Sequence, residues 1–345
     1  MANTDFDTIM QEITAGLTGD PKKDVPYLND KAKSYQNSKY AKEIARACGR
    51  LLYSVLPKEA REKADRMAAN HSLGIQSVIE EAQFNMYQKQ FDAAKDILAS
   101  AVAHYEEIAF FQDDAVSEYH TFNTPIEEII YRHRCQPKKE LRQAPEPLSL
   151  LYMNLGVVLL ELEEMDAAKD ALEKAMRWNP IDADIAFEHA EIFKKLGRMD
   201  EFFKLTMGIF PNVYQRRHLA RCYRNLGYYF VEKELWEVAA SCYLISIHYD
   251  KDTPQAQSEL WYIQQKADAG FSMPTSEEEI EKYARQYHIP MGANQDVIGI
   301  AMYFGEQSEK GGQIDAAKYF YSIAYDLTGF NEIQERLDAL PQEAD

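Results

Sequence analysis

The sequence predicts an all-helical chain in which helical hairpins stack one on the next into a solenoid. Apolar residues recur at helical spacing in pairs of segments, and a short polar turn separates the members of each pair. The same spacing between small residues returns at several places along the 345 residues, which indicates a repeat architecture. With fifteen Gly and thirteen Pro, the chain has too few turn residues for a loop-rich all-β protein.

The clearest hairpin spans residues 150–180. A polar turn at 161–164 separates its two helices, and Pro180 closes it. The apolar faces consist of Tyr152, Leu155, Gly156 and Leu159 in the first helix, and of Met165, Ala168, Leu172 and Ala175 in the second. Gly156 and Ala168 fall where the two helices cross, and a larger side chain at either place would push the helix axes apart.

These residues resemble the tetratricopeptide repeat family, of the type found in bacterial cytosolic proteins. The resemblance consists of an aromatic-x-x-Leu-Gly-x-x-large pattern at 152–159, an Ala-x-x-x-large-x-x-Ala pattern at 168–175 and the closing Pro180. It implies a right-handed superhelix of α-α hairpins with a concave face. It also implies a protein that binds a peptide or a partner helix there and has no catalytic activity.

Further copies cover about residues 75–108, 149–253 and 298–331. In the copy near residue 220, the spacing from Gly227 to Ala239 equals that from Gly156 to Ala168. In the copy between them, Phe202 replaces the usual small residue, which predicts a splayed or shifted hairpin. The predicted crossing positions are Gly156, Ala168, Gly227, Ala239, Gly305 and Ala317.

We expect residues 1–72 to form an N-terminal helical region and residues 73–345 to form the solenoid. Asp20-Pro21 is expected to interrupt the N-terminal region after its first helix. The helical periods of this region lie at 6–17, 40–56 and 57–69. These helices form either a separate bundle or divergent hairpins that continue the array.

The solenoid carries an insertion at residues 109–148, in which a short helix is expected at 126–131. An aromatic insertion of this length is either a structural lid over a neighbouring groove or a loop that contacts a ligand. Residues 254–297 read as a degraded hairpin. A final helix at 332–340 is expected to cap the exposed apolar end of the last hairpin.

The candidate binding site lies on the first helix of the copy near residue 220. Arginines there follow a stripe that differs from the buried face, and they would attract an acidic or carboxylate-terminated partner. By resemblance to the family, the positions just after the aromatic residue and just before the Leu of each first helix face the groove. The predicted groove residues are Arg217, Arg221, Arg224, Asn225 and Tyr228, together with Met153, Asn154, Glu188 and Glu191.

A structural role for the arginines is the alternative, because Glu188 and Glu191 on the preceding first helix stand on the matching face and could neutralise them. The carboxylate clamp of some family members does not carry over. Met153 and Val157 are apolar, and Glu188 stands where a neutral or basic residue is needed.

Other kinds of chemistry lack their sequence patterns. The eight His and four Cys show no spacing typical of a metal site, no phosphate-binding glycine loop is present, and no cofactor is expected. The net charge of −18 argues against binding to nucleic acid or to an anionic membrane. The four cysteines lie far apart and show no CxxC spacing, and the acidic N-terminus is unlike a secretory signal. Both features predict a cytoplasmic protein with reduced cysteines.

The main hypothesis is therefore a non-enzymatic scaffold that binds a protein or peptide in its concave groove. The alternative is a peptide-sensing regulator in which the tetratricopeptide array controls an N-terminal effector module. The partner, the pathway and the oligomeric state have no signature in the sequence. The register also predicts that Trp236 is mostly buried and that Trp178 is partly exposed.

Overall fold

The described chain is mostly helical, as the repeat spacing predicts. The computed structural model describes residues 4–62, 74–108 and 111–341. Two compact units form: residues 1–121 with 137–154, and residues 122–136 with 155–345. The boundary predicted between residues 72 and 73 and the end of the predicted helix at 57–69 lie outside the described residues, so the predicted division at residue 72 stays a prediction.

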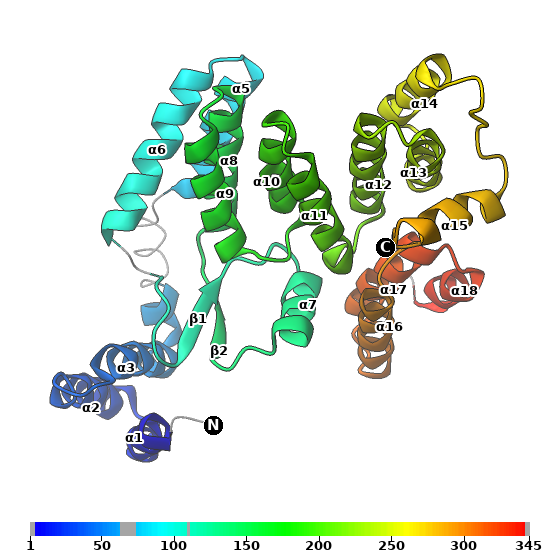
Figure 1. Cartoon of the computed structure of the whole chain (residues 1–345). Coiled ribbons are helices and arrows are strands. Elements are labelled where there is room, and N and C mark those ends of the chain that lie inside the picture. Colours follow the sequence, from blue (N-terminus) through cyan, green and yellow to red (C-terminus); the bar gives the residue numbers. More distant parts are fainter. Residues whose placement is uncertain (1–3, 63–73, 109–110, 342–345) are drawn as a thin grey trace. The chain divides into compact units, whose positions relative to one another are not determined.

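The first unit begins with three helices that share a small core, in which Ile13, Leu28 and Ile44 are fully buried. A helical hairpin follows and coincides with the predicted N-terminal copy (Figure 1). The helices are α1 (Thr4–Ala15), α2 (Pro21–Ser34), α3 (Ala41–Val55), α5 (Ile75–Tyr87) and α6 (Phe91–Ile108).

The expected interruption at Asp20-Pro21 is confirmed, because α1 ends at Ala15 and α2 begins at Pro21, but helix α2 itself was not predicted. The Asp20 side chain accepts a hydrogen bond from the Lys22 backbone N–H at 3.0 Å and so caps the helix. Proline at the first helical position needs no hydrogen-bond acceptor for its nitrogen. The same two residues that can interrupt a helix therefore begin one here.

The insertion also contains two short strands that the all-helical prediction omitted. Strands β1 (Ser117–His120) and β2 (Glu140–Gln143) pair in parallel, with Ser117 opposite Glu140. The segment before β1 is held by α3, because Arg46 pairs with Asp114 at 2.6 Å. Helix α7 (Pro125–Cys135) is longer than the helix predicted at 126–131.

The second unit contains α7 and the hairpins α10–α11, α12–α13 and α16–α17 (Figure 1). Helix α8 (Leu148–Glu161) passes from the first unit into the second. The other elements are α9 (Met165–Trp178), α10 (Ala183–Lys195), α11 (Met199–Ile209), the 3-10 turn η1 (Phe210–Asn212), α12 (Arg216–Glu232), α13 (Trp236–Tyr249), α14 (Pro254–Lys266), α15 (Glu277–Gln286), α16 (Gln295–Lys310), α17 (Ile314–Thr328) and α18 (Asn331–Ala339).

Glycine allows the helices of these hairpins to approach closely. A Cβ atom built on Gly156 would lie 2.5 Å from the Leu172 side chain, and one on Gly227 would lie 2.7 Å from the Tyr243 ring. On Gly305 it would lie 2.6 Å from Tyr321. Contacts this short do not occur between real side chains, so each crossing requires glycine. The alanines on the partner helices, Ala168, Ala239 and Ala317, are fully buried.

The predicted order of tryptophan burial is wrong. Trp178 is only 6% exposed, whereas Trp236 is half-buried. The Arg177 guanidinium lies 4.3 Å from the Trp178 ring, and the buried residue Ile181 follows in the loop. A position at the end of a helix therefore does not expose Trp178, because neighbouring side chains cover it.

The C-terminal half of the second unit departs from regular stacking. Helix α15 packs on α13, and α18 packs on α17. Ser276 caps α15 by accepting from the Glu279 backbone N–H at 3.2 Å. No helix of the described chain has the length and apolar character needed to cross a membrane.

Candidate functional site

Five of the predicted groove residues come together in one open pocket. Its volume is about 520 Å³, and it is lined by α10, α12, α13, the start of α14 and the loop before α14. We call this pocket the α10–α12–α14 groove. The predicted residues that line it are Glu191, Arg221, Arg224, Asn225 and Tyr228.

The two groove arginines already have acidic partners within the chain. Arg221 donates to Glu188 at 2.9 Å, and its guanidinium carbon lies 4.5 Å from the centre of the Phe187 ring. Arg224 lies 3.4 Å from the Asp250 carboxylate. Burial lowers the pKa of Arg224, and the nearby Asp250 opposes that shift. Both cations are thus fixed in place on α12 by neighbouring elements.

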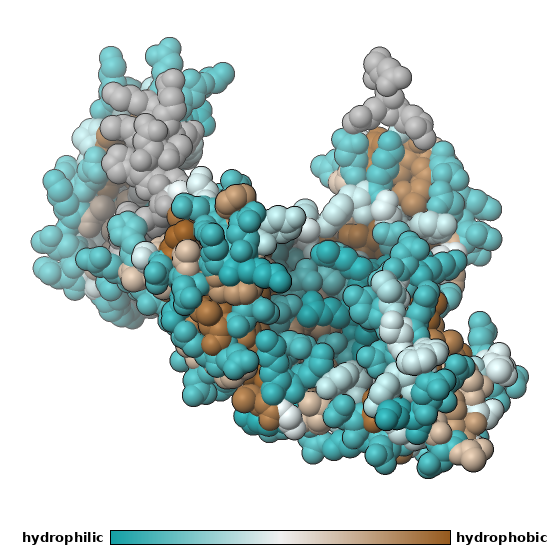
Figure 2. Space-filling model, turned by 90° about the horizontal axis from the view of Figure 1, so that it is seen from above, coloured by the Kyte–Doolittle hydropathy of each residue, from teal (hydrophilic) through white to brown (hydrophobic). Residues whose placement is uncertain are grey.

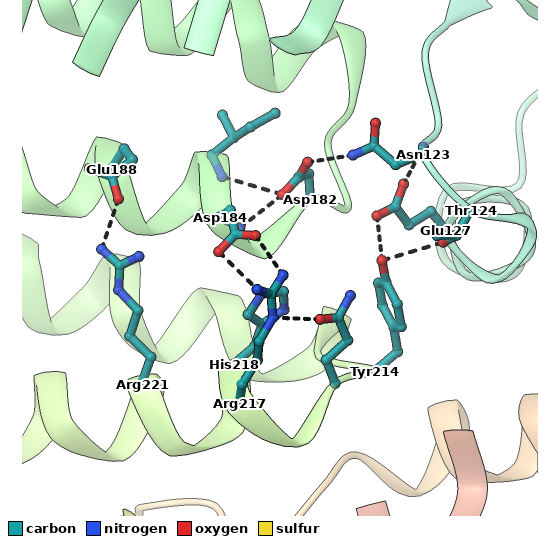
Figure 3. Close-up of polar contacts among 12 residues, drawn as sticks. Asn123, Thr124, Glu127, Asp182, Asp184, Glu188, Tyr214, Arg217, His218 and Arg221 are labelled. Atoms are coloured by element: carbon teal, nitrogen blue, oxygen red, sulfur yellow. Dashed lines mark hydrogen bonds and ion pairs between the residues drawn. The ribbon is translucent and has the colours of Figure 1, made fainter. Parts of the chain in front are cut away.

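Arg217 stands outside the lining of this groove. Its side chain is 66% exposed and pairs with Asp184 at 3.2 Å (Figure 3). The buried His218 places Nε2 3.1 Å from the other oxygen of the same carboxylate. Although burial opposes it, the close His218 imidazole and the charge of Arg217 lower the pKa of Asp184. Arg217 therefore helps to join α12 to the start of α10.

The remaining groove residues also contact their neighbours. Glu191 pairs with Lys194 at 3.3 Å rather than with an arginine. The Lys194 ammonium lies 4.5 Å from the centre of the Tyr228 ring. Asn225 donates to the Thr206 hydroxyl at 3.5 Å. The groove thus presents hydrogen-bonding groups and charges of both signs.

Met153 and Asn154 belong to the first unit, whereas the groove belongs to the second. Asn154 is 4% exposed, accepts from Gln83 Nε2 at 3.2 Å and donates to the Leu150 carbonyl at 2.7 Å. Its amide is therefore engaged by α5 and by its own helix α8, within the first unit. A role of this pair in binding stays a prediction.

A buried carboxylate on α7 was not found from the sequence. Glu127 is 2% exposed and accepts from the Asn123 N–H at 2.7 Å, from Asn179 Nδ2 at 2.8 Å and from the Tyr214 hydroxyl at 2.7 Å. Burial and the charge of Glu127 raise the pKa of Tyr214. An acid in the first turn of a helix usually favours the positive end of the helix dipole, so the position of Glu127 in the sequence gave no sign of this network. Figure 3 shows Glu127 and its contacts with Asn123 and Tyr214.

A second carboxylate belongs to the same network. Asp182 is 7% exposed, caps α10 and accepts from Asn123 Nδ2 at 2.7 Å. Burial, followed by the negative charge of Glu127, raises the pKa of Asp182 to about 6. This cluster fastens α7 to the loops that precede α10 and α12.

The described groove lining contains no His, Cys or Ser, and its one hydroxyl amino acid other than Tyr, Thr253, donates to Asp250. Elsewhere in the described chain, no three His, Cys, Asp or Glu side chains gather as a metal site would require. The absence of catalytic activity stays a prediction.

Comparison with known families places one repeat directly. Residues 150–182 match the family model described as the tetratricopeptide repeat. The chain carries a tetratricopeptide repeat. Repeats of this kind mediate protein–protein interactions, and the hairpins that flank the match give this tetratricopeptide-repeat protein its fold.

Solved structures similar to this tetratricopeptide-repeat protein share little sequence with it. Pseudomonas aeruginosa pilF is 14% identical, with 76% of this chain and 96% of that chain covered and a TM-score of 0.40. YrrB, described as a tetratricopeptide-repeat protein with an unusual peptide-binding site, is 17% identical, with coverages of 72% and 96% and a TM-score of 0.36. A tetratricopeptide-repeat protein from Parabacteroides merdae is 9% identical, with coverages of 92% and 98% and a TM-score of 0.37. No curated protein matches the chain.

Proposed function

We propose that this tetratricopeptide-repeat protein is a non-enzymatic scaffold that binds a peptide or a partner helix in the α10–α12–α14 groove. The proposal rests on one observation: Arg221, Arg224, Asn225 and Tyr228 share a pocket that helices α10, α12, α13 and α14 line. Amide and guanidinium donors suit the carbonyl groups of an extended peptide. Tyr228 offers contact area at low cost in conformational entropy.

An acidic group on the partner is part of the proposal. Among the described residues, Arg221 gives one hydrogen bond, to Glu188, and a guanidinium carries five N–H donors. A carboxylate of the partner can therefore bind Arg221 without displacing Glu188. The alternative is that Arg221 and Arg224 only join α12 to its neighbours, as their bonds to Glu188 and Asp250 allow.

The first prediction separates these roles with the double variant Arg221→Ala/Arg224→Ala. Because charge-assisted hydrogen bonds strengthen binding, we expect the dissociation constant to rise at least about tenfold, or ~1.4 kcal/mol. Partners are captured from a lysate of the source cell on the immobilised wild-type chain. They are then titrated by calorimetry against wild type and variant.

The matched control is Arg198→Ala/Arg285→Ala, which removes two arginines that pair with Glu201 and Glu281 outside the groove. This control should bind as wild type does. If the groove variant melts at a lower temperature but binds with an unchanged dissociation constant, the arginines are structural and the groove proposal fails.

The regulator remains a second hypothesis, and residues 1–72 decide it. Helices α1–α3 have their own core, yet Glu43 of α3 accepts from the Ala115 N–H at 3.0 Å. This bond gives the N-terminal helices a fixed attachment within the first unit. We therefore favour the scaffold.

A further inference from the structure

A second trough adjoins the α10–α12–α14 groove in the same unit. Its volume is about 730 Å³, and it lies between the C-terminal half of α12 and helix α14. Tyr228 and Glu259 line both spaces, so the two are continuous. Its further lining includes Glu232, Trp261 and Tyr262.

Exposed aromatic rings distinguish this trough. Trp261 is 65% exposed and Tyr262 is 40% exposed, although both are large apolar side chains. Helix α14 buries Ala256 and Ile263 against the rest of the unit, which leaves the rings on its other side. Neighbouring exposed aromatics beside a groove are typical of a contact surface.

The acids of the trough lack the pairing that the arginines have. In the described part of the chain, no Lys, Arg or His lies within ion-pair distance of Glu232 or Glu259. Burial and then the charge of Glu232 raise the pKa of Glu259, while Lys194 lowers it. The trough therefore has negative charge to offer, whereas each groove arginine has an acid beside it.

Helix ends add to this negative potential. Glu232 is the last residue of α12, and Trp261 and Tyr262 lie in the final turns of α14, which ends at Lys266. Helix C-termini carry partial negative charge and favour cations. The chain itself places ammonium groups near two of the rings: Lys194 lies 4.5 Å from the centre of Tyr228, and Lys266 lies 6.0 Å from that of Tyr262.

We propose that the trough binds a lysine or arginine side chain of the partner, held over Trp261 and paired with Glu232 and Glu259. The proposal rests on the proposed function and specifies its partner. A basic side chain gains attraction to the indole face and to two carboxylates at once. A bound segment then has a direction, with its acidic group near Arg221 and Arg224 and its basic group at the α14 trough.

Selection of random peptides displayed on phage against the full wild-type chain tests this inference. The selected sequences should share one Lys or Arg position. The best binder is synthesised, as is a copy with Gln at that position. On the wild-type chain the exchange to Gln should weaken binding at least about tenfold. On Glu232→Gln/Glu259→Gln the starting peptide should bind weakly, and the exchange should have little further effect.

Matched controls exclude general effects of charge and of aromatic removal. Glu332→Gln/Glu335→Gln removes two acids from α18 and should keep the tenfold difference. Trp261→Ala should reduce binding, whereas Tyr303→Ala, which removes an aromatic residue 58% exposed on α16, should not. Melting curves by circular dichroism verify that each variant folds.

The failures are distinguishable. If the selection yields no binding peptide, the proposed function is overturned and the inference with it. If peptides bind in the groove without a shared basic residue, the trough inference alone is overturned. The same conclusion follows if the exchange to Gln weakens binding equally on the wild type and on Glu232→Gln/Glu259→Gln.

Discussion

At the scale of single residues, two buried carboxylates, Glu127 and Asp182, both accept hydrogen bonds from Asn123. Glu127 accepts three hydrogen bonds, whereas Asp182 caps α10 and accepts one from the Asn123 side chain. Burial and then the charge of Glu127 raise the pKa of Asp182 to about 6, so the folded chain binds this proton more tightly than the unfolded chain does. Charging this group at neutral pH opposes folding.

The sign of the pH effect follows from that raised pKa. The stability that protonation of Asp182 contributes is fully present below the ordinary Asp pKa of about 3.9 and is lost as the pH rises through about 6. Asp182→Asn keeps the helix cap but carries no charge. We expect it to stabilise the chain by about 1–2 kcal/mol at pH 8 relative to wild type.

Thermal melting of both proteins across a pH series checks this expectation, because the difference should fade below about pH 4. Asp182→Ala is the control, since it also removes the charge but loses the cap. An Asn variant that is less stable than wild type at pH 8 would show that the carboxylate is needed in its charged form.

At the scale of helices, the crossings decide which hairpins form. Gly156, Gly227 and Gly305 each face a large side chain on the second helix of their hairpin. Elsewhere in helices, glycine only weakens the helix. Gly299 in α16 has no atom within 4 Å of the position a Cβ would take.

Substitution by alanine should change the stability of the chain in opposite directions at these two kinds of glycine. Gly227→Ala forces a contact with Tyr243 and should destabilise the chain by roughly 1–3 kcal/mol. Gly299→Ala should stabilise it by about 0.5–1 kcal/mol, because alanine favours the helix. Urea unfolding of both variants measures the difference. An equal free energy of unfolding for Gly227→Ala and wild type would contradict the crossing geometry.

Tryptophan emission reports the helix environments directly. Trp178 is 6% exposed, Trp236 is half-buried and Trp261 is 65% exposed. In variants that keep one tryptophan and replace the others by Phe, emission should be bluest from Trp178 and reddest from Trp261. A bluer emission from Trp236 than from Trp178 would restore the order that the sequence alone predicts.

The helices were predictable where local pattern and packing agree. Small residues at the crossings recur with helical spacing, so the hairpins could be located from the sequence. Helix α2 was missed because Asp20-Pro21 suits both the interruption and the start of a helix. Strands β1 and β2 hold four residues each, too few to show an alternating pattern.

The candidate site was predictable by the same reasoning only in part. Repeat position placed Arg224 and Asn225 in a groove, because every first helix presents those positions alike. Asp250 follows α13, the second helix of the same repeat, and Trp261 lies on α14, outside the clear repeats. Their approach to α12 depends on tertiary packing, which a helical period does not encode.

At the scale of the whole molecule, the sequence is strongly acidic. Hydrophilic residues occupy most of the face shown in Figure 2, in keeping with the net charge of −18. A strong net charge keeps a chain soluble and separated from its copies. The exposed aromatics of α14 differ from this background, which is a further reason to look for a partner there.

The path of the chain has a consequence for biosynthesis. The chain passes between its units after Thr121, after Gln136 and, inside α8, after Asn154. On the ribosome, the segment that carries Glu127 emerges well before Asn179 and Tyr214, the donors that it needs. The first unit is complete at Asn154 and can fold before the ribosome releases the residues that hydrogen-bond to Glu127. A single cut or a single recombination point cannot separate the units, because each unit is built from two segments of the chain.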